Sequence, residues 1–365
     1  MTGLTRSLSL LRTKAALIRL GIVFIAVWLA AVEIFTQSGL SKNAAEHQAR
    51  QTEFGVSGGS ADDFTKKFCC GGTLGALVTN GTGLFILSNN HVLALSDRGT
   101  AGQPITQPGL IDTNCNPETV VAHLTTFVPL TSGTVDAAIA ELVPGTMDPG
   151  GAVLGIGDIS SVVTSPSIGM SVVKSGRTTG VTKSSIESIG ADIKIVYKAQ
   201  CNKGPKFTVI YNNQVMVRGA DFSQSGDSGS LILTNDECHQ PVALLYGGND
   251  TDTIGNPIQD VLSAFGVSVV GNSADCSSQA EAQIAGPILQ QQDVDEALAA
   301  KAEQRDYLMS MSSVLGVGVS ASQNNPGRPV VAVYVDRAAG LIPPIPSQIQ
   351  GMPVEVRFVE QFVAR

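Results

Sequence analysis

Short apolar runs separated by glycine-containing turns predict β structure for most of the chain. Residues 73–78 and 84–88 are two such runs, and the sequence Asn-Gly-Thr-Gly at residues 80–83 lies between them, which predicts a β-hairpin. A further apolar strand is expected at residues 231–233. This part of the chain is therefore expected to consist of short strands joined by tight turns.

A different pattern follows a polar break at residues 272–275. Residues 293–312 contain helix-forming residues with apolar positions at helical spacing. A proline-rich segment, residues 342–347, connects the last two of three β-rich runs. These runs are residues 314–319, 330–335 and 354–359. The pattern predicts a small α+β unit over residues 285–365.

The N-terminal residues have the pattern of an export signal. Four basic side chains precede the apolar run 20–32, and small residues at 36–38 offer a cleavage site. The run is shorter than the roughly 20 residues of a membrane-spanning helix, so residues 1–38 are predicted to be a signal peptide, with a membrane anchor as the alternative. Residues 39–65 are expected to be a polar linker with little fixed structure.

Basic residues before the apolar run predict that the rest of the chain is exported. The expected location is periplasmic, extracellular or membrane-anchored with the folded part outside the cytoplasm. The alternative is a cytosolic protein with an apolar N-terminal helix.

Residues 225–230, Ser-Gly-Asp-Ser-Gly-Ser, are the first candidate for chemistry. Glycines permit a tight turn, so that backbone N–H groups converge on one point. A hydroxyl beside converging amides supplies a nucleophile and a site for an oxyanion, which acyl transfer requires. The alternative is an ordinary turn between strands.

A histidine at a strand end is the second candidate. Of four histidines, only His91 directly follows the predicted hairpin, where functional side chains often lie. His47 lies in a polar stretch and is expected to be solvated. His123 and His239 are expected to be surface or packed residues.

The third candidate is a carboxylate inside an apolar run. Asp136 is flanked by Val135 and Ala137, so it is expected to be partly buried, and a buried charge needs a partner. An imidazole N–H is suitable, and Asp136 would then fix the tautomer of His91. The alternative is a turn aspartate at a strand end.

Four motifs together resemble the chymotrypsin-like (trypsin-fold) serine peptidases of bacterial type. The motifs are residues 88–94, 134–138, 174–180 and 225–230. The order His91, Asp136, Ser228 is that of this family and not of subtilisins or α/β-hydrolases. The resemblance implies a mainly β fold, in which a double six-stranded β-barrel over residues 66–276 precedes the small α+β unit.

The resemblance also implies roles for individual residues. Ser228 would be the nucleophile, His91 the general base and then acid, and Asp136 the orienting carboxylate. The amides of Gly226 and Ser228 would form the oxyanion hole. The implied function is an exported serine endopeptidase that cleaves protein or peptide substrates through an acyl-enzyme, with no cofactor and no metal.

The loop around the nucleophile is expected to need support. Asp227 would pair with a fixed cation, and Lys174 is favoured for this role over Arg177. The alternative is that both cations are ordinary surface residues.

The resemblance also implies a primary specificity pocket at Phe222 and Ser223 and along a strand at residues 246–248 that pairs with the substrate. In this strand Tyr246 and Gly248 are the expected substrate-binding residues, and Gly248 would leave the pocket open. No aspartate occupies the expected pocket base, although Asp221 is one residue away. The prediction is an apolar or small side chain at P1, the residue whose carbonyl group is attacked, rather than arginine or lysine.

Composition and charge narrow the classes of function that the chain can have. The chain has 365 residues, a hydrophobic content of 43% and a net charge of −8, which suits two compact units and argues against nucleic acid as the main partner. Six cysteines permit disulfides in an exported protein. Cys201 with Cys238, and Cys69 or Cys70 with Cys115, are the pairings considered, and the connectivity stays open.

Two other function classes remain. One is a binding or scaffold protein that keeps the barrels without cleaving, and the other is an esterase, because the same site acylates on esters. The presence of all three triad residues favours the peptidase.

Overall fold

The computed structural model describes residues 44–272, 289–340 and 343–365. The predicted signal segment lies outside the described residues. The chain divides into Met1–Glu46 and His47–Arg365, and all the described strands belong to the second unit. No helix in the described ranges is long and apolar enough to cross a bilayer.

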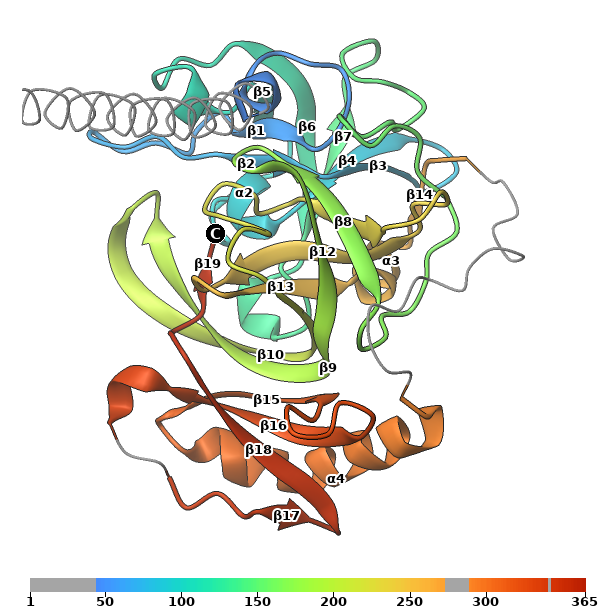
Figure 1. The fold of residues 1–365 in the computed structure, drawn as a ribbon. Helices are drawn as coiled ribbons and strands as arrows, with labels where there is room; N and C mark the ends of the chain where they lie inside the picture. Colours follow the sequence, from blue (N-terminus) through green and yellow to red (C-terminus); the bar gives the residue numbers. More distant parts are fainter. Residues whose placement is uncertain (1–43, 273–288, 341–342) are drawn as a thin grey trace, which may run out of the picture. The chain divides into compact units, whose positions relative to one another are not determined.

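The first β-barrel contains the predicted hairpin (Figure 1). Its strands are β1 (Val56–Ser60), β2 (Gly72–Leu74), β3 (Ala76–Thr79), β4 (Leu84–Ser88), β5 (Pro104–Gln107), β6 (Thr119–Phe127) and β7 (Ala138–Leu142). The order β3-β4-β7-β6-β5-β1-β2 closes on itself because only Gly75 separates β2 from β3. A short strand, β14 (Ser268–Val269), pairs with β3.

The second β-barrel contains six strands. They are β8 (Ser171–Gly176), β9 (Gly180–Gln200), β10 (Lys203–Arg218), β11 (Leu231–Thr234), β12 (Pro241–Gly248) and β13 (Asp252–Pro257). The order β10-β13-β12-β11-β8-β9 closes through the antiparallel pairing of β9 with β10. With β2 and β3 counted as one strand interrupted at Gly75, the first barrel also has six strands, so the predicted fold class, a double six-stranded barrel followed by a small α+β unit, is confirmed.

Helices are few in this part of the chain. They are α2 (Asn90–Leu93), α3 (Ile258–Phe265) and the 3-10 turns η1 (Leu110–Asp112) and η2 (Leu130–Ser132). The main hydrophobic core lies inside the first barrel and continues into the second through Leu231, Leu233 and Leu244. The two barrels therefore share a packed boundary.

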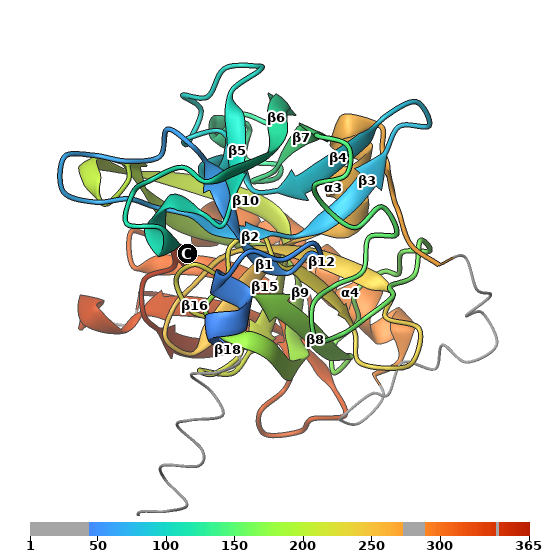
Figure 2. The same ribbon diagram turned by 90° about the horizontal axis from the view of Figure 1, so that it is seen from above.

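The C-terminal unit continues the sheet of the second barrel. Its elements are α4 (Gln291–Ser310), β15 (Val314–Ala321), β16 (Pro329–Asp336), η4 (Arg337–Ala339), β17 (Gln348–Ile349), β18 (Met352–Val359) and β19 (Val363–Ala364). The predicted helix and three strands are present, and β15 pairs antiparallel with β9. The chain then returns to the barrels, where β19 pairs with β12 (Figures 1 and 2).

The prediction of a polar linker over residues 39–65 is wrong for residues 44–65, the part of this segment that the structure describes. Strand β1 is completely buried, and the ring of His47, expected to be solvated, is also buried with Nε2 2.9 Å from Ser175 Oγ. The segment looked like a spacer because it is polar. Its serines are hydrogen-bonded inside the barrel instead: Ser57 Oγ accepts from the Gly109 amide at 3.0 Å, and Ser60 Oγ accepts from Gln103 at 2.9 Å.

Adjacent cysteines tie one loop to both barrels. Cys69 pairs with Cys115, as considered, whereas Cys70 pairs with Cys201. The pairing of Cys201 with Cys238 is therefore wrong. The reason is the length of the β9–β10 hairpin (yellow-green at the left of Figure 1), which carries Cys201 in its turn to the first barrel.

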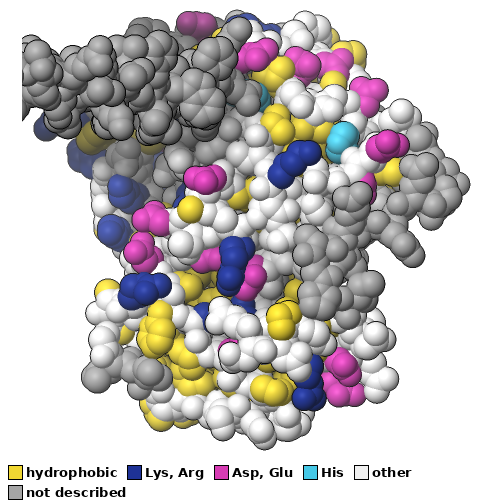
Figure 3. All heavy atoms as spheres, in the orientation of Figure 1, with side chains coloured by type: hydrophobic (Ala, Val, Ile, Leu, Met, Phe, Trp, Pro, Cys, Tyr) yellow, Lys and Arg dark blue, Asp and Glu magenta, His cyan; other side chains and the backbone are white. Residues whose placement is uncertain are grey.

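Charged side chains of both signs are interspersed on the face seen in Figure 3. Lys and Arg side chains there lie among Asp and Glu side chains and form no continuous basic surface.

Candidate active site

The structure brings His91 and Asp136 together. His91 lies on α2, directly after β4, and Asp136 lies two residues before β7. Their atoms Nδ1 and Oδ2 are 2.6 Å apart, and the backbone amide of His91 donates to Oδ1 at 3.3 Å. Asp136 has no exposed surface, so its negative charge depends on this pairing.

A tyrosine from the other barrel completes the surroundings of Asp136. The hydroxyl of Tyr197, on β9, donates to Oδ2 of Asp136 at 2.8 Å and lies 3.1 Å from the hydroxyl of Tyr211. Burial and the nearby Asp136 carboxylate raise the pKa of Tyr197, which keeps the hydroxyl protonated as a donor. No local sequence pattern indicates this contact, because it joins residues of separate barrels.

The imidazole of His91 has acceptors on both sides. Burial lowers its pKa, but the Asp136 carboxylate outweighs burial, and the pKa is raised overall. Nε2 lies 3.2 Å from the backbone carbonyl oxygen of Arg365, the residue that follows β19. A carbonyl oxygen only accepts hydrogen bonds, so the imidazolium form, with a proton on each nitrogen, satisfies both partners.

Ser228 shares a backbone acceptor with the same chain segment. Its hydroxyl donates to the carbonyl oxygen of Tyr246 at 3.2 Å, and that oxygen also accepts the Arg365 amide at 3.2 Å. Within the described residues Ser228 Oγ therefore bonds to Tyr246 and not to His91, whose Nε2 faces the backbone oxygen of Arg365. A cavity of about 450 Å³ adjoins His91, Gly226 and Arg365.

Backbone amides are available beside Ser228. Gly226 has φ +101°, and a β carbon there would clash with Thr178 and Arg177, so the turn requires glycine. In the described ranges, the N–H groups of Gly226 and Ser228 have no hydrogen-bond partner. These are the two amides that the sequence predicted for an oxyanion.

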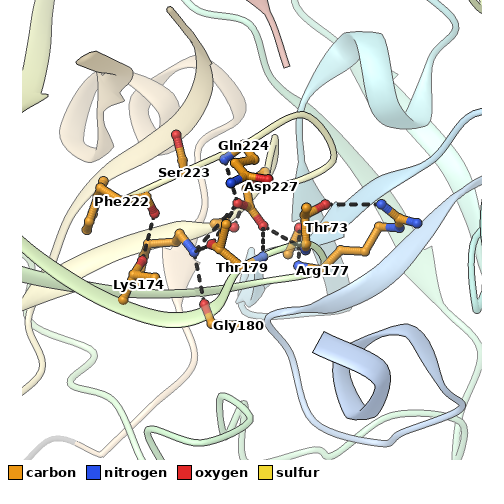
Figure 4. A network of polar contacts seen from close by, with 12 residues as sticks. Thr73, Lys174, Arg177, Thr179, Gly180, Phe222, Ser223, Gln224 and Asp227 are labelled. Atoms are coloured by element: carbon orange, nitrogen blue, oxygen red, sulfur yellow. Dashed lines mark hydrogen bonds and ion pairs between the residues drawn. The ribbon is translucent and has the colours of Figure 1, made fainter. Parts of the chain in front are cut away.

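Asp227 points away from the cavity into a buried network (Figure 4). Its carboxylate accepts from the amides of Thr178, Thr179 and Gln224 at 2.8, 3.2 and 2.9 Å. Lys174 Nζ lies 3.7 Å from Oδ2, and both side chains are fully buried. The favoured cation is therefore the one beside Asp227.

Arg177 has a different partner. Its Nε donates to Asp112 Oδ2 at 2.7 Å, and its Nη2 contacts Asp112 Oδ1, so the ion pair is bidentate. Its backbone amide donates to Thr73 Oγ1, which donates to the carbonyl of Gly226 at 3.0 Å. Arg177 thereby links the second barrel to the first beside the nucleophile loop.

The residues predicted to line the specificity pocket lie in different surroundings in the structure. The side chain of Phe222 is buried in the second barrel with Lys174 Nζ 5.9 Å from its ring centre, and it does not line the cavity. The next residue, Ser223, contacts Arg365 instead. Tyr246 offers its backbone, while its ring packs 5.0 Å from that of Tyr211.

Lys174→Met is expected to destabilise the folded protein by about 3 kcal/mol, because it leaves the buried Asp227 carboxylate without its cation. Urea unfolding measures this loss. The double variant Lys174→Met with Asp227→Asn should regain part of it, and a double variant as unstable as the single one would contradict a paired role.

The pH dependence of stability supplies a second readout. Burial lowers the pKa of Lys174 from 10.5 to about 8, against the opposing effect of Asp227. The unfolded chain therefore binds more protons between these two pH values, so Lys174 makes stability rise with pH across that window. This rise should disappear in Lys174→Met.

Part of the chain is similar to known proteins. The family model of the Nal1 C-terminal domain matches residues 109–255. No curated protein matches.

Several solved structures are similar in fold. A glutamic acid specific serine protease is 20% identical, with 59% of this chain and 98% of that chain covered and a TM-score of 0.42. Thermobifida fusca protease A is 18% identical (60% and 99% covered, TM-score 0.40), and Cellulomonas bogoriensis chymotrypsin is 16% identical (60% and 99% covered, TM-score 0.38). Function is therefore inferred from the geometry of this chain's own residues.

Proposed function

We propose that this protein is a serine endopeptidase that cleaves peptide bonds through an acyl-enzyme. One observation carries the proposal: an extended peptide segment is paired with β12, its last backbone oxygen lies 3.2 Å from Nε2 of the His91–Asp136 pair, and its last amide shares the Tyr246 carbonyl with the Ser228 hydroxyl. A site that holds a peptide backbone beside a base and a hydroxyl has the parts that peptide cleavage needs.

Each group then has a defined task. Ser228 Oγ attacks the substrate carbonyl carbon as His91 Nε2 takes its proton. The amides of Gly226 and Ser228 donate to the oxyanion of the tetrahedral intermediate. His91 passes the proton to the leaving amine as the C–N bond breaks, and the acyl group stays on Ser228.

Water completes the cycle by the same route. His91 takes a proton from water as the water oxygen attacks the acyl carbon, and returns it to Ser228 Oγ when the acid leaves. Asp136 keeps the Nδ1 proton in place and stabilises the imidazolium, while the Tyr197 hydroxyl holds the carboxylate. Lys174 and Asp227 hold the loop that presents the amides.

We also propose that the protein acts outside the cytoplasm. The support is the pair of disulfides, Cys69–Cys115 and Cys70–Cys201, since disulfides persist in oxidising compartments.

A fluorophosphonate probe tests the proposed nucleophile. The intact chain and an Arg365→Glu variant are labelled, and mass spectrometry of the peptides is expected to place the adduct on Ser228. Ser228→Ala should lose the adduct, whereas Ser225→Ala, a change at an exposed neighbouring serine, should keep it. Absence of a Ser228 adduct from both folded chains would refute the peptidase and the esterase alternative together.

A further inference from the structure

The last residues of the chain bind along β12 as an added strand. Val363 pairs with Gly248 and Ala364 with Gly247 in antiparallel register, and the Arg365 amide donates to the Tyr246 carbonyl at 3.2 Å. This is β-augmentation, in which backbone hydrogen bonds hold an extended peptide on a sheet edge. The backbone oxygen of Arg365 then lies 3.2 Å from His91 Nε2, at the end of the paired segment.

The Arg365 side chain enters a pocket that contains only acceptors at contact distance. Nη1 donates to Ser223 Oγ at 2.9 Å and to the Ser223 carbonyl, and Nη2 donates to the Asn249 carbonyl. Burial lowers the pKa of Arg365, and the negative charges of Asp227, Asp250 and Asp252 oppose this effect. The pocket thus favours a cation without an aspartate in direct contact.

The shape of the pocket depends on Gly248. A β carbon at this position would clash with the carbonyl oxygen of Asp252 and lie 3.1 Å from Nε of Arg365, so both the local backbone and the space for the guanidinium require glycine. The loop beyond it is fixed by hydrogen bonds, since Asn249 Oδ1 accepts from the amides of Thr251 and Asp252 at 3.0 and 2.8 Å. The acceptors are therefore in place before a ligand binds.

These contacts carry an inference that rests on the proposed function. We propose that the enzyme selects arginine at P1, and that residues 363–365 occupy its own subsites as the acyl part of such a substrate would. The expected preference for an apolar or small P1 side chain is thereby revised. That expectation depended on the lack of a carboxylate at the pocket base, whereas Ser223 and Asn249 supply neutral oxygens in its place.

Arginine fits these acceptors better than lysine does. Ser223 and Asn249 accept from different nitrogens of one guanidinium, Nη1 and Nη2. A planar fork with fixed donors reaches both at once, whereas a single ammonium reaches one side only. We therefore expect kcat/KM to be higher for substrates with arginine at P1 than for those with lysine, and higher for lysine than for uncharged residues.

Peptide amides that differ only at P1 test the proposal, with the full-length Arg365→Glu variant as enzyme so that the chain's own arginine does not compete. The expected kcat/KM for arginine exceeds that for phenylalanine, alanine or glutamate by at least about tenfold. Arg365→Ala serves as a second enzyme in case the glutamate disturbs folding, which thermal melting reports.

Matched variants test the pocket residues. Ser223→Ala removes the side-chain acceptor of Nη1 and should lower the ratio of arginine to alanine kcat/KM by about tenfold. Asp221→Asn, an exposed carboxylate near the pocket, should leave that ratio unchanged. A ratio lost in Asp221→Asn would overturn the assignment to Ser223 and Asn249.

The failures of the two proposals are distinguishable. Preference for another P1 residue by an enzyme that labels at Ser228 would overturn arginine selectivity and leave the peptidase standing. No cleavage of any peptide and no label would overturn both.

Discussion

Asp136→Asn is expected to lower kcat by about 10⁴-fold while the protein stays folded. The carboxylate accepts the Nδ1 proton of His91 at 2.6 Å, and in the proposed mechanism this tautomer leaves Nε2 unprotonated to take the proton of Ser228 once Arg365 has left the site. An asparagine in the same place can present its amide to Nδ1 and so favour the wrong tautomer. The measurement is steady-state kcat on an arginyl peptide amide in the Arg365→Glu background.

Two further variants define the size of this effect. Tyr197→Phe removes the hydroxyl that donates to Asp136 but keeps the carboxylate, so we expect a loss nearer to tenfold. Asp158→Asn, at an exposed carboxylate, should change nothing. A loss below tenfold for Asp136→Asn in a normally folded protein would remove Asp136 from the mechanism.

Arg365→Glu is expected to raise turnover of an arginyl substrate by roughly 10² to 10³-fold, because it releases the chain's own strand from the site. This range is the ratio of an effective concentration of about 1 to 10 mM for the tethered segment to a dissociation constant of about 10 µM for three bound residues. A glutamate brings no donor for the carbonyl oxygens of Ser223 and Asn249 and places a negative charge beside them, so the pocket disfavours it.

Arg365→Lys is the matched control and should raise turnover far less, since the cation and the backbone contacts remain. The pH profile gives an independent check. The Arg365 carbonyl is one of the groups that raise the pKa of His91, so its release should move the acidic limb of kcat/KM to lower pH. Equal turnover in the glutamate variant and the unchanged chain would show that the strand does not block the site.

Local patterns in the sequence predicted much of the site. The hairpin at residues 76–88, the His91–Asp136 pair and the buried cation Lys174 were all predicted. Each depends on a short signal: a turn between apolar runs, a charge inside an apolar run, and a cation before a turn.

The parts that were missed depend on contacts between distant segments. Tyr197 reaches Asp136 from the other barrel, and Cys201 reaches Cys70 only because the β9–β10 hairpin is long. The proposed arginine pocket could not be predicted because Arg365, which contacts Ser223, lies 142 positions away from it in the sequence. No pattern within a window of the sequence contains that information.

A fragment ending before α4 would keep His91, Asp136 and Ser228 but would expose part of the second barrel. β15 covers the hydrogen-bonding edge of β9 from Ser188 to Ile193. Without it, a row of backbone N–H and C=O groups on a 21-residue strand would be open to pairing with other molecules, which invites aggregation. The C-terminal unit thus acts as a permanent edge cover, and the solubility of the protein is expected to depend on keeping it attached.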